Sequence, residues 1–243
     1  MSAAAPAEYF IGWDVGGWNC DKNAKSRDAL VILDAQRAIV GTSWRGNLRR
    51  SINAADSSVA WLRALFGLCK TDFPETGANV TLGVDTPLGF SDVLVQLITR
   101  RMIAEVIGDD SGTNPYLFRA TERFLFEQGI TPLSPVKDMI GSQATKGMHV
   151  LAKFAPQVVS CGVWSDGAKL TVIEAYPSPC RHSARIAELL RPYTKLDHPD
   201  KHDALVCALL GCLFATERDS LAQPAAEVST SEGWIWVPQD VLP

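Results

Sequence analysis

Four acidic residues stand where the predicted elements of this chain begin or end. Asp14, Asp85 and Glu174 each close an apolar run of the kind typical of a buried strand, and Asp203 opens an apolar helical run. Strand ends and helix starts meet at one edge of an α/β sheet, where ligands bind. Carboxylates gathered there repel one another unless a cation lies between them. The pattern therefore predicts a divalent-metal site, and the hard oxygen ligands favour Mg²⁺ or Mn²⁺.

Each of these carboxylates also has a structural interpretation. Asp14 could cap the Gly-Gly turn that follows it, and Asp85 could fix the turn after its strand. Glu174 could pair with an arginine. Asp203 could interact with the dipole of its helix, beside Asp200 on the same helical face.

The elements that would position these residues follow from hydrophobic periodicity. Three strands, a crossover helix and a fourth strand match the ribonuclease H-like arrangement, in which the second strand is antiparallel. We therefore predict an α/β fold, namely a ribonuclease H-like mixed five-stranded sheet flanked by helices, with a helical insertion after the fourth strand. The predicted strands cover residues 8–14, 28–33, 38–44, 79–84, 158–164 and 169–175, and the predicted helices cover 54–69, 91–107, 121–129, 136–154, 183–191 and 200–216.

The chain is expected to form a single domain over residues 1–243. Residues 1–7 are predicted to be a disordered tail, and residues 90–156 form the helical insertion. Residues 217–231 are polar and proline-bearing, which predicts a loop. The apolar residues after this loop indicate that the chain then returns to the body of the domain.

Five motifs, in the same order and spread over nearly the whole chain, resemble a known family. The family is the "domain of unknown function 429" group of predicted ribonuclease H-like nucleases. The motifs are Gly12-Trp13-Asp14-Val15-Gly16-Gly17, then Gly83-Val84-Asp85-Thr86-Pro87-Leu88-Gly89, Ile173-Glu174-Ala175-Tyr176-Pro177-Ser178, His202-Asp203-Ala204-Leu205 with Cys207-Ala208, and Glu232-Gly233-Trp234-Ile235 with Pro238.

The resemblance implies cleavage of a phosphodiester by two metal ions about 4 Å apart. Asp14 would bridge the two ions, Asp85 would bind one of them, and Asp203 would reach them from the first turn of its helix. Glu174 would bind metal or orient water. The expected partner is a nucleic acid or a nucleotide phosphate ester.

An arginine and a glutamate in the insertion, Arg119 and Glu122, resemble a pair found in the same family. An arginine at this place could hold a phosphate or carboxylate through two hydrogen bonds. This predicts a substrate-binding role for both residues. The alternative is an ordinary salt bridge on the surface.

Composition narrows the function classes further. The net charge of −4 provides no bulk positive field for long duplex nucleic acid, so short or single-stranded substrates are favoured. The six cysteines form no Cys-x-x-Cys pair, which disfavours a structural zinc site. No secretory signal is visible, and no apolar run approaches the ~20 residues needed to span a bilayer. We therefore expect a cytoplasmic protein without membrane attachment, and the oligomeric state stays open.

Two other function classes remain open at this point. The first is an ATP-using phosphotransferase of the actin, Hsp70 and sugar-kinase type, which shares this fold and an Asp-x-Gly-Gly opening whose amides bind phosphate. Those proteins usually need two such domains, and no second glycine-rich phosphate loop is evident here. The second is a non-catalytic binding module, which would be favoured if the four carboxylates lay far apart.

Overall fold

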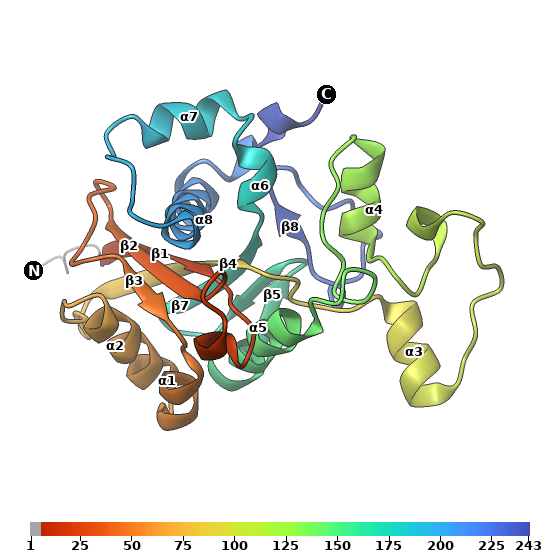
Figure 1. Ribbon diagram of the computed structural model, residues 1–243, viewed down its shortest axis with the longest axis horizontal. Coiled ribbons are helices and arrows are strands. Elements are labelled where there is room, and N and C mark those ends of the chain that lie inside the picture. Colours follow the sequence, from red (N-terminus) through yellow and green to blue (C-terminus); the bar gives the residue numbers. More distant parts are fainter. Residues whose placement is uncertain (1–5) are drawn as a thin grey trace, which may run out of the picture.

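The computed structural model describes residues 6–243, and its centre is one open mixed sheet (Figure 1). Within these residues, the strands run in the order β3-β2-β1-β4-β7-β6-β5, and β8 pairs with the end of β7. The strands β1, β4, β7 and β8 are parallel, whereas β2 is antiparallel to β1. The bounds are β1 Ala7–Asp14, β2 Asp28–Asp34, β3 Trp44–Gly46, β4 Ala78–Asp85, β5 Gln157–Ser160, β6 Val163–Ser165, β7 Leu170–Ala175 and β8 Ile235–Trp236.

Helices cover both faces of the sheet (Figure 1). The helices α1, α2 and α5 pack on one face, and α6, α7 and α8 pack on the other, so each face has its own apolar core. The bounds are α1 Arg49–Ala54, α2 Ser58–Leu68, α3 Asp92–Arg100, α4 Ala120–Glu127, α5 Gly141–Phe154, α6 Pro177–Cys180, α7 Ala184–Leu190 and α8 Pro199–Thr216. The predicted α/β class with a mixed sheet flanked by helices is therefore confirmed.

The number of strands differs from the prediction. The described part of the chain has eight strands in the sheet, where five were expected. Three of the eight, β3, β6 and β8, are only two or three residues long. The strand expected over residues 158–164 is two strands, β5 and β6, and the strand expected over residues 38–44 is replaced by β3, which begins only at Trp44. Segments as short as β8 complete no hydrophobic period, so pairing with a longer neighbour places them in the sheet.

The tail predicted over residues 1–7 falls mostly outside the described part of the chain. Residues 1–5 are not described, and Ala7 is already the first residue of β1, where it pairs in register with Ala78. Residues 86–156, which hold the predicted insertion, lie between β4 and β5 and carry α3, α4 and α5. In the part of the chain that the structure covers, no helix combines the length and the apolar character that crossing a membrane requires.

Two glycines allow α8 to lie directly on the central strands. A Cβ atom on Gly12 would stand 1.7 Å from the carbonyl oxygen of Ala204, and one on Gly83 would stand 2.4 Å from that of Cys207. Any side chain at either position would push the helix off the sheet. Two residues after each glycine, the strand ends at an acidic residue, Asp14 or Asp85. Side chains two residues apart on a strand point to the same face of the sheet. Helix α8 therefore packs, from Ala204 onward, on the sheet face from which those acidic side chains emerge.

Candidate functional site

Asp14 and Asp85 form the centre of the candidate site. They are the last residues of the parallel strands β1 and β4, and they pair in register. The Cα atoms of neighbours in this position lie about 4.8 Å apart, with both side chains on the same face. Both residues are half-buried, and neither carboxylate accepts a hydrogen bond from another described residue. Within residues 6–243, the two carboxylates thus lie side by side with no hydrogen bond or ion pair to offset their charge.

Asp203 reaches the same face from α8, which begins at Pro199. It is half-buried, and its nearest cation is the exposed guanidinium of Arg181, with Nη2 at 4.0 Å from Oδ1. Asp200, one turn earlier, is engaged instead: its Oδ2 accepts from Nε of Arg45 at 2.7 Å and from the backbone N–H of Arg27 at 3.0 Å. The two neighbours differ: Asp200 ties the start of the helix to the β2–β3 side of the sheet, whereas Asp203 has only the long contact with Arg181 among the described residues.

Electrostatics distinguish the free carboxylates from ordinary surface acids. Burial, followed by repulsion from Asp85, Asp200 and Asp203, raises the pKa of Asp14 to about 9. Burial, followed by repulsion from Asp203 and Glu174, raises the pKa of Asp85 to about 8. Burial also raises the pKa of Asp203, although Arg181 opposes the shift. A cation placed among these groups would remove the repulsion and favour their ionised forms.

The side chains do not form a complete metal cage. Across residues 6–243, no group of three or more His, Cys, Asp or Glu residues is arranged to hold a metal ion. Mg²⁺, however, is usually held by one or two carboxylates and completes its shell with water and substrate phosphates. Asp14 and Asp85 fit a site of this second kind, because their oxygens are free and they share one edge.

Glu174 leaves the sheet from the opposite face. It pairs in register with Val84, the residue before Asp85, so its side chain begins on the side of the α2 and α5 core. It is buried, and its two carboxylate oxygens bind Arg119, with Nη1 at 2.8 Å from Oε2 and Nη2 at 2.6 Å from Oε1. Its Oε2 also accepts from the backbone N–H of Leu88 at 2.9 Å. The structure therefore contains the ion pair with an arginine that was the structural interpretation of Glu174.

Arg119 is fully buried rather than exposed to a substrate. Besides Glu174, it binds Glu122 through Nε at 2.8 Å and Nη2 at 2.7 Å, and the carbonyl oxygen of Glu232 through Nη1 at 3.0 Å. Arg119 thus makes five contacts, one for each N–H group of its guanidinium. The alternative that Arg119 forms an ordinary salt bridge on the surface is therefore wrong, because its ion pairs are buried. In this arrangement Arg119 and Glu122 bind protein groups, and neither has a free group to offer to a substrate.

Glu232 extends this cluster into a latch, by which we mean the four buried residues Arg119, Glu122, Glu174 and Glu232. The Glu232 carboxylate accepts from the backbone N–H groups of Asp92 at 2.9 Å and Ala120 at 2.6 Å. The latch thereby joins both ends of the residue 91–119 segment to β7 and to the chain before β8. These polar residues hold the insertion in place beside Asp85.

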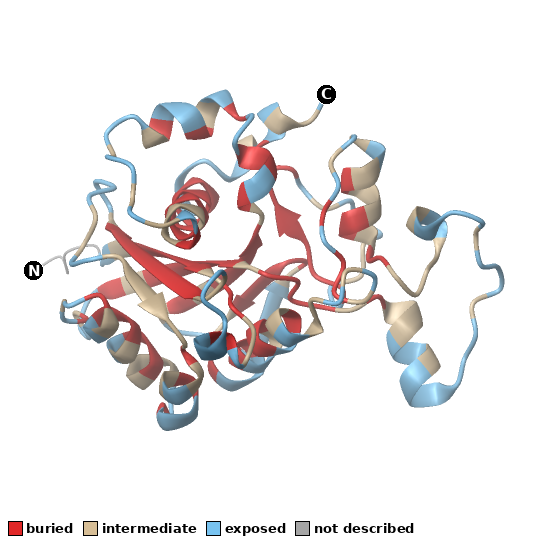
Figure 2. Ribbon diagram, viewed as in Figure 1, coloured by how far each residue is buried: buried red, intermediate tan, exposed pale blue. Residues whose placement is uncertain are grey.

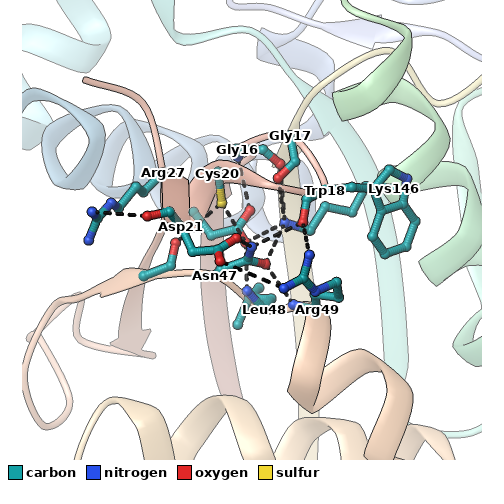
Figure 3. A network of polar contacts seen from close by, with 12 residues as sticks. Gly16, Gly17, Trp18, Cys20, Asp21, Arg27, Asn47, Leu48, Arg49 and Lys146 are labelled. Carbon is teal, nitrogen blue, oxygen red and sulfur yellow. Dashed lines mark hydrogen bonds and ion pairs between the residues drawn. The ribbon is translucent and has the colours of Figure 1, made fainter. Parts of the chain in front are cut away.

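A second buried pair, Lys146 and Asp28, fixes the turn after Asp14. Lys146 of α5 contacts the Asp28 carboxylate and donates to the carbonyl oxygen of Gly16 at 3.1 Å (Figure 3). Asp28 also accepts from the backbone N–H groups of Gly16 at 2.9 Å and Leu48 at 2.7 Å. Both charged side chains are fully buried. This pair sets the backbone that carries Asp14, and the sequence interpretation missed it. The available signal was a charged residue, Asp28, opening an otherwise apolar strand.

A pocket of about 190 Å³ opens at the free carboxylates. Asp14, Asp85 and Glu174 line it, together with Pro132, Leu133, Ile140 and Gln143 of the insertion. Thr86 also lines the pocket, and its buried hydroxyl has no hydrogen-bond partner among the described residues. The pocket thus joins acidic groups at the sheet edge to a largely apolar wall from the insertion.

The C-terminal tryptophans do not belong to this site. Trp234 and Trp236 are buried, and their indole N–H groups donate to the carbonyl oxygens of Ala222 and Gly162, each at 2.9 Å. They anchor the end of the chain in the core, so they offer no surface for stacking a base.

Comparison of the chain with models of protein families, with curated proteins and with solved structures found no match in any of the three.

Proposed function

We propose that this protein is a divalent-metal-dependent phosphodiester hydrolase, in which Asp14 and Asp85 hold Mg²⁺ or Mn²⁺ and Asp203 assists them. The observation that carries the proposal is the registered pair of half-buried carboxylates without hydrogen-bond partners at one sheet edge. Carboxylates left unpaired beside each other are costly unless a cation joins them. The order β3-β2-β1-β4, with β2 antiparallel, supports the ribonuclease H-like identity that the sequence resemblance implies.

The residues take separate parts in this proposal. Asp14 and Asp85 supply oxygen ligands from strand ends whose positions the sheet fixes. Asp203 adds negative charge on the same face from the second turn of α8. A bound ion would lower the pKa of a coordinated water and offset the charge of the phosphodiester. Glu174, through the latch, holds the insertion at the pocket and does not contact the ion.

The pocket limits the size of the substrate. Its volume of about 190 Å³ is below the roughly 300–1,000 Å³ typical of sites for drug-sized ligands. A pocket of this size suits one phosphate-bearing unit, such as a nucleotide or the end of a single strand, rather than the middle of a duplex. All six cysteines are free thiols, which is consistent with the reducing cytoplasm that we propose for this reaction.

The test is hydrolysis in Mn²⁺ of labelled single-stranded RNA, single-stranded DNA and a panel of nucleotides. We expect turnover by the wild type that is lost in EDTA, and a loss on the order of 10³-fold in Asp14→Asn, because a missing ligand forfeits several kcal/mol of charge stabilisation. Asp56→Asn, at an exposed aspartate elsewhere on the molecule, is the control and should retain full activity. Equal turnover by Asp14→Asn would contradict the proposal. Hydrolysis of ATP without cleavage of any nucleic acid would favour the phosphotransferase class.

A further inference from the structure

Residues 91–116 leave the body of the molecule and return to it at nearly the same place (Figure 1). We call this segment the arm. It carries α3, in which no residue is buried, and Figure 2 shows α3 and the loop that follows it as intermediate or exposed along their length. A helix of nine residues, none of them buried, has little stability of its own. A contact outside this chain would supply the missing stabilisation.

The arm concentrates the exposed apolar surface of the molecule. Of the ten large hydrophobic residues exposed within the described chain, six lie on the arm. Val95 and Ile98 are spaced at i and i+3, so they lie on one face of α3, and Met102 is the second residue beyond the end of the helix. We call these three residues, together with Ile103 and Val106, the stripe. Ile103 and Val106 follow in the loop after α3 and are 80% and 76% exposed. A large exposed apolar surface on a monomer marks an interaction site.

The base of the arm is fixed rather than loose. The hydroxyl of Ser91 donates to the carbonyl oxygen of Pro115, which closes the base, and the backbone N–H of Asp92 binds Glu232 of the latch at 2.9 Å. Farther along, the Tyr116 hydroxyl accepts from the N–H of Ala104 at 2.8 Å. The apolar stripe is therefore presented from an anchored support, which reduces the ordering cost of binding.

The charges on the arm indicate what covers it. Asp92 begins α3, and Arg100 and Arg101 end it. Two copies of α3 packed antiparallel would place the acidic start of each helix beside the basic end of the other. With Glu105, Asp109 and Asp110 included, residues 92–110 carry four acidic and two basic side chains. This net negative charge disfavours an anionic lipid surface, which attracts basic segments.

We propose that the arm is a homodimer interface in which two copies of the chain pack their α3 stripes antiparallel about a twofold axis. A twofold interface brings the same patch of both copies together, so an arm with an apolar stripe between opposite charges is complementary to itself. The proposal is independent of the hydrolase assignment, because it uses no residue of the pocket.

Sedimentation velocity of the full chain at micromolar concentration tests this interface. We expect the wild type to sediment as a dimer, and Ile98→Glu and Ile103→Glu, made separately, each to sediment as a monomer. Both side chains are highly exposed, so the thermal melts of these variants should show a folded protein. The matched control is Gln96→Glu, which adds the same charge to the same helix at an exposed position off the stripe, and it should remain a dimer.

Three results would overturn the proposal. A wild type that stays monomeric over the concentration range would remove the interface altogether. A dimer that persists in both Ile98→Glu and Ile103→Glu would place the interface elsewhere on the molecule. Monomeric wild type that binds vesicles of anionic lipid, with binding lost in Ile98→Glu, would assign the arm to a membrane surface instead.

Discussion

Asp203 and Asp200 lie one turn apart on α8 and have different surroundings, so their variants should behave differently. We expect Asp203→Asn to lower hydrolysis by orders of magnitude. The stability should change little, because the Asp203 carboxylate accepts no hydrogen bond from the described residues and lies 4.0 Å from its cation, Arg181. Asp200→Asn should instead lower the free energy of unfolding by about 1–3 kcal/mol, since Arg45 and the Arg27 amide lose a charged acceptor. Activity assays and thermal melts of both variants check this. A fully stable Asp200→Asn without activity would show that Asp200, not Asp203, serves the reaction.

Removing Arg119 should destabilise the protein rather than weaken substrate binding alone. Arg119→Ala leaves Glu122 and Glu174 buried without their cation, which costs about 3–5 kcal/mol in free energy of unfolding. Arg63→Ala, which breaks an exposed pair with Glu75, is the matched control and should cost about 0–1 kcal/mol. Urea denaturation measures both values. Similar, small losses in the two variants would mean that the latch does not hold the fold.

Sequence patterns located some residues of the site and not others for a physical reason. Asp14 and Asp85 were identifiable because each ends an apolar run, and neighbouring parallel strands bring such ends together. Arg119, Asp28 and Lys146 were not recognisable as buried groups, because a charged residue in a sequence is solvated unless a partner arrives from elsewhere in the chain. The partners are 55 residues away for Arg119 with Glu174 and 118 residues away for Lys146 with Asp28.

At the scale of elements, the packing of α8 on β1 depends on the absence of a side chain at Gly12. Gly12→Ala would place a methyl group 1.7 Å from the Ala204 carbonyl oxygen, and backbone on both sides has little room to move. We expect a loss of at least about 1–3 kcal/mol and reduced hydrolysis, because α8 also carries Asp203. Gly67→Ala in α2 meets no atom within 4 Å and should stabilise the protein by about 0.5–1 kcal/mol. Chemical denaturation compares them, and a Gly12→Ala variant as stable as Gly67→Ala would contradict the described packing.

Element boundaries were predictable where packing and periodicity agree. The last helix was expected over residues 200–216, and α8 spans Pro199–Thr216. The helix expected to run to residue 107 ends at Arg100 instead, where Arg101 adopts a left-handed conformation with φ of 55°. The apolar residues beyond it, among them Ile103 and Val106, are exposed, so no packing maintains the helix there. The helix expected over residues 54–69 is α2, which begins later, at Ser58, because the side chain of Ser57 caps its start. Helix α1, Arg49–Ala54, precedes it as a separate helix that was not expected.

For the whole molecule, the free carboxylates should make metal-free stability depend on pH. The pKa values of Asp14 and Asp85 rise from an ordinary 3.8 to about 9 and about 8, so the folded state binds more protons than the unfolded state between about pH 4 and 9. Their contribution to the free energy of unfolding therefore falls as pH rises through this window. In EDTA, the stability of wild type relative to Asp14→Asn should fall steadily from pH 5 to pH 9. A relative stability that rises over this range would contradict the electrostatics of the site.

The central claim is that Asp14 and Asp85 hold a divalent cation, and direct titration with Mn²⁺ tests it without needing a substrate. Electron paramagnetic resonance of free Mn²⁺ measures the affinity of the wild type, of Asp14→Asn and Asp85→Asn, and of Asp200→Asn as a control one helical turn from Asp203. We predict Mn²⁺ binding that weakens at least about tenfold in each of the first two variants, since each loses one of two carboxylate ligands, and that changes little in Asp200→Asn. Equal affinity in wild type, Asp14→Asn and Asp85→Asn would contradict the claim.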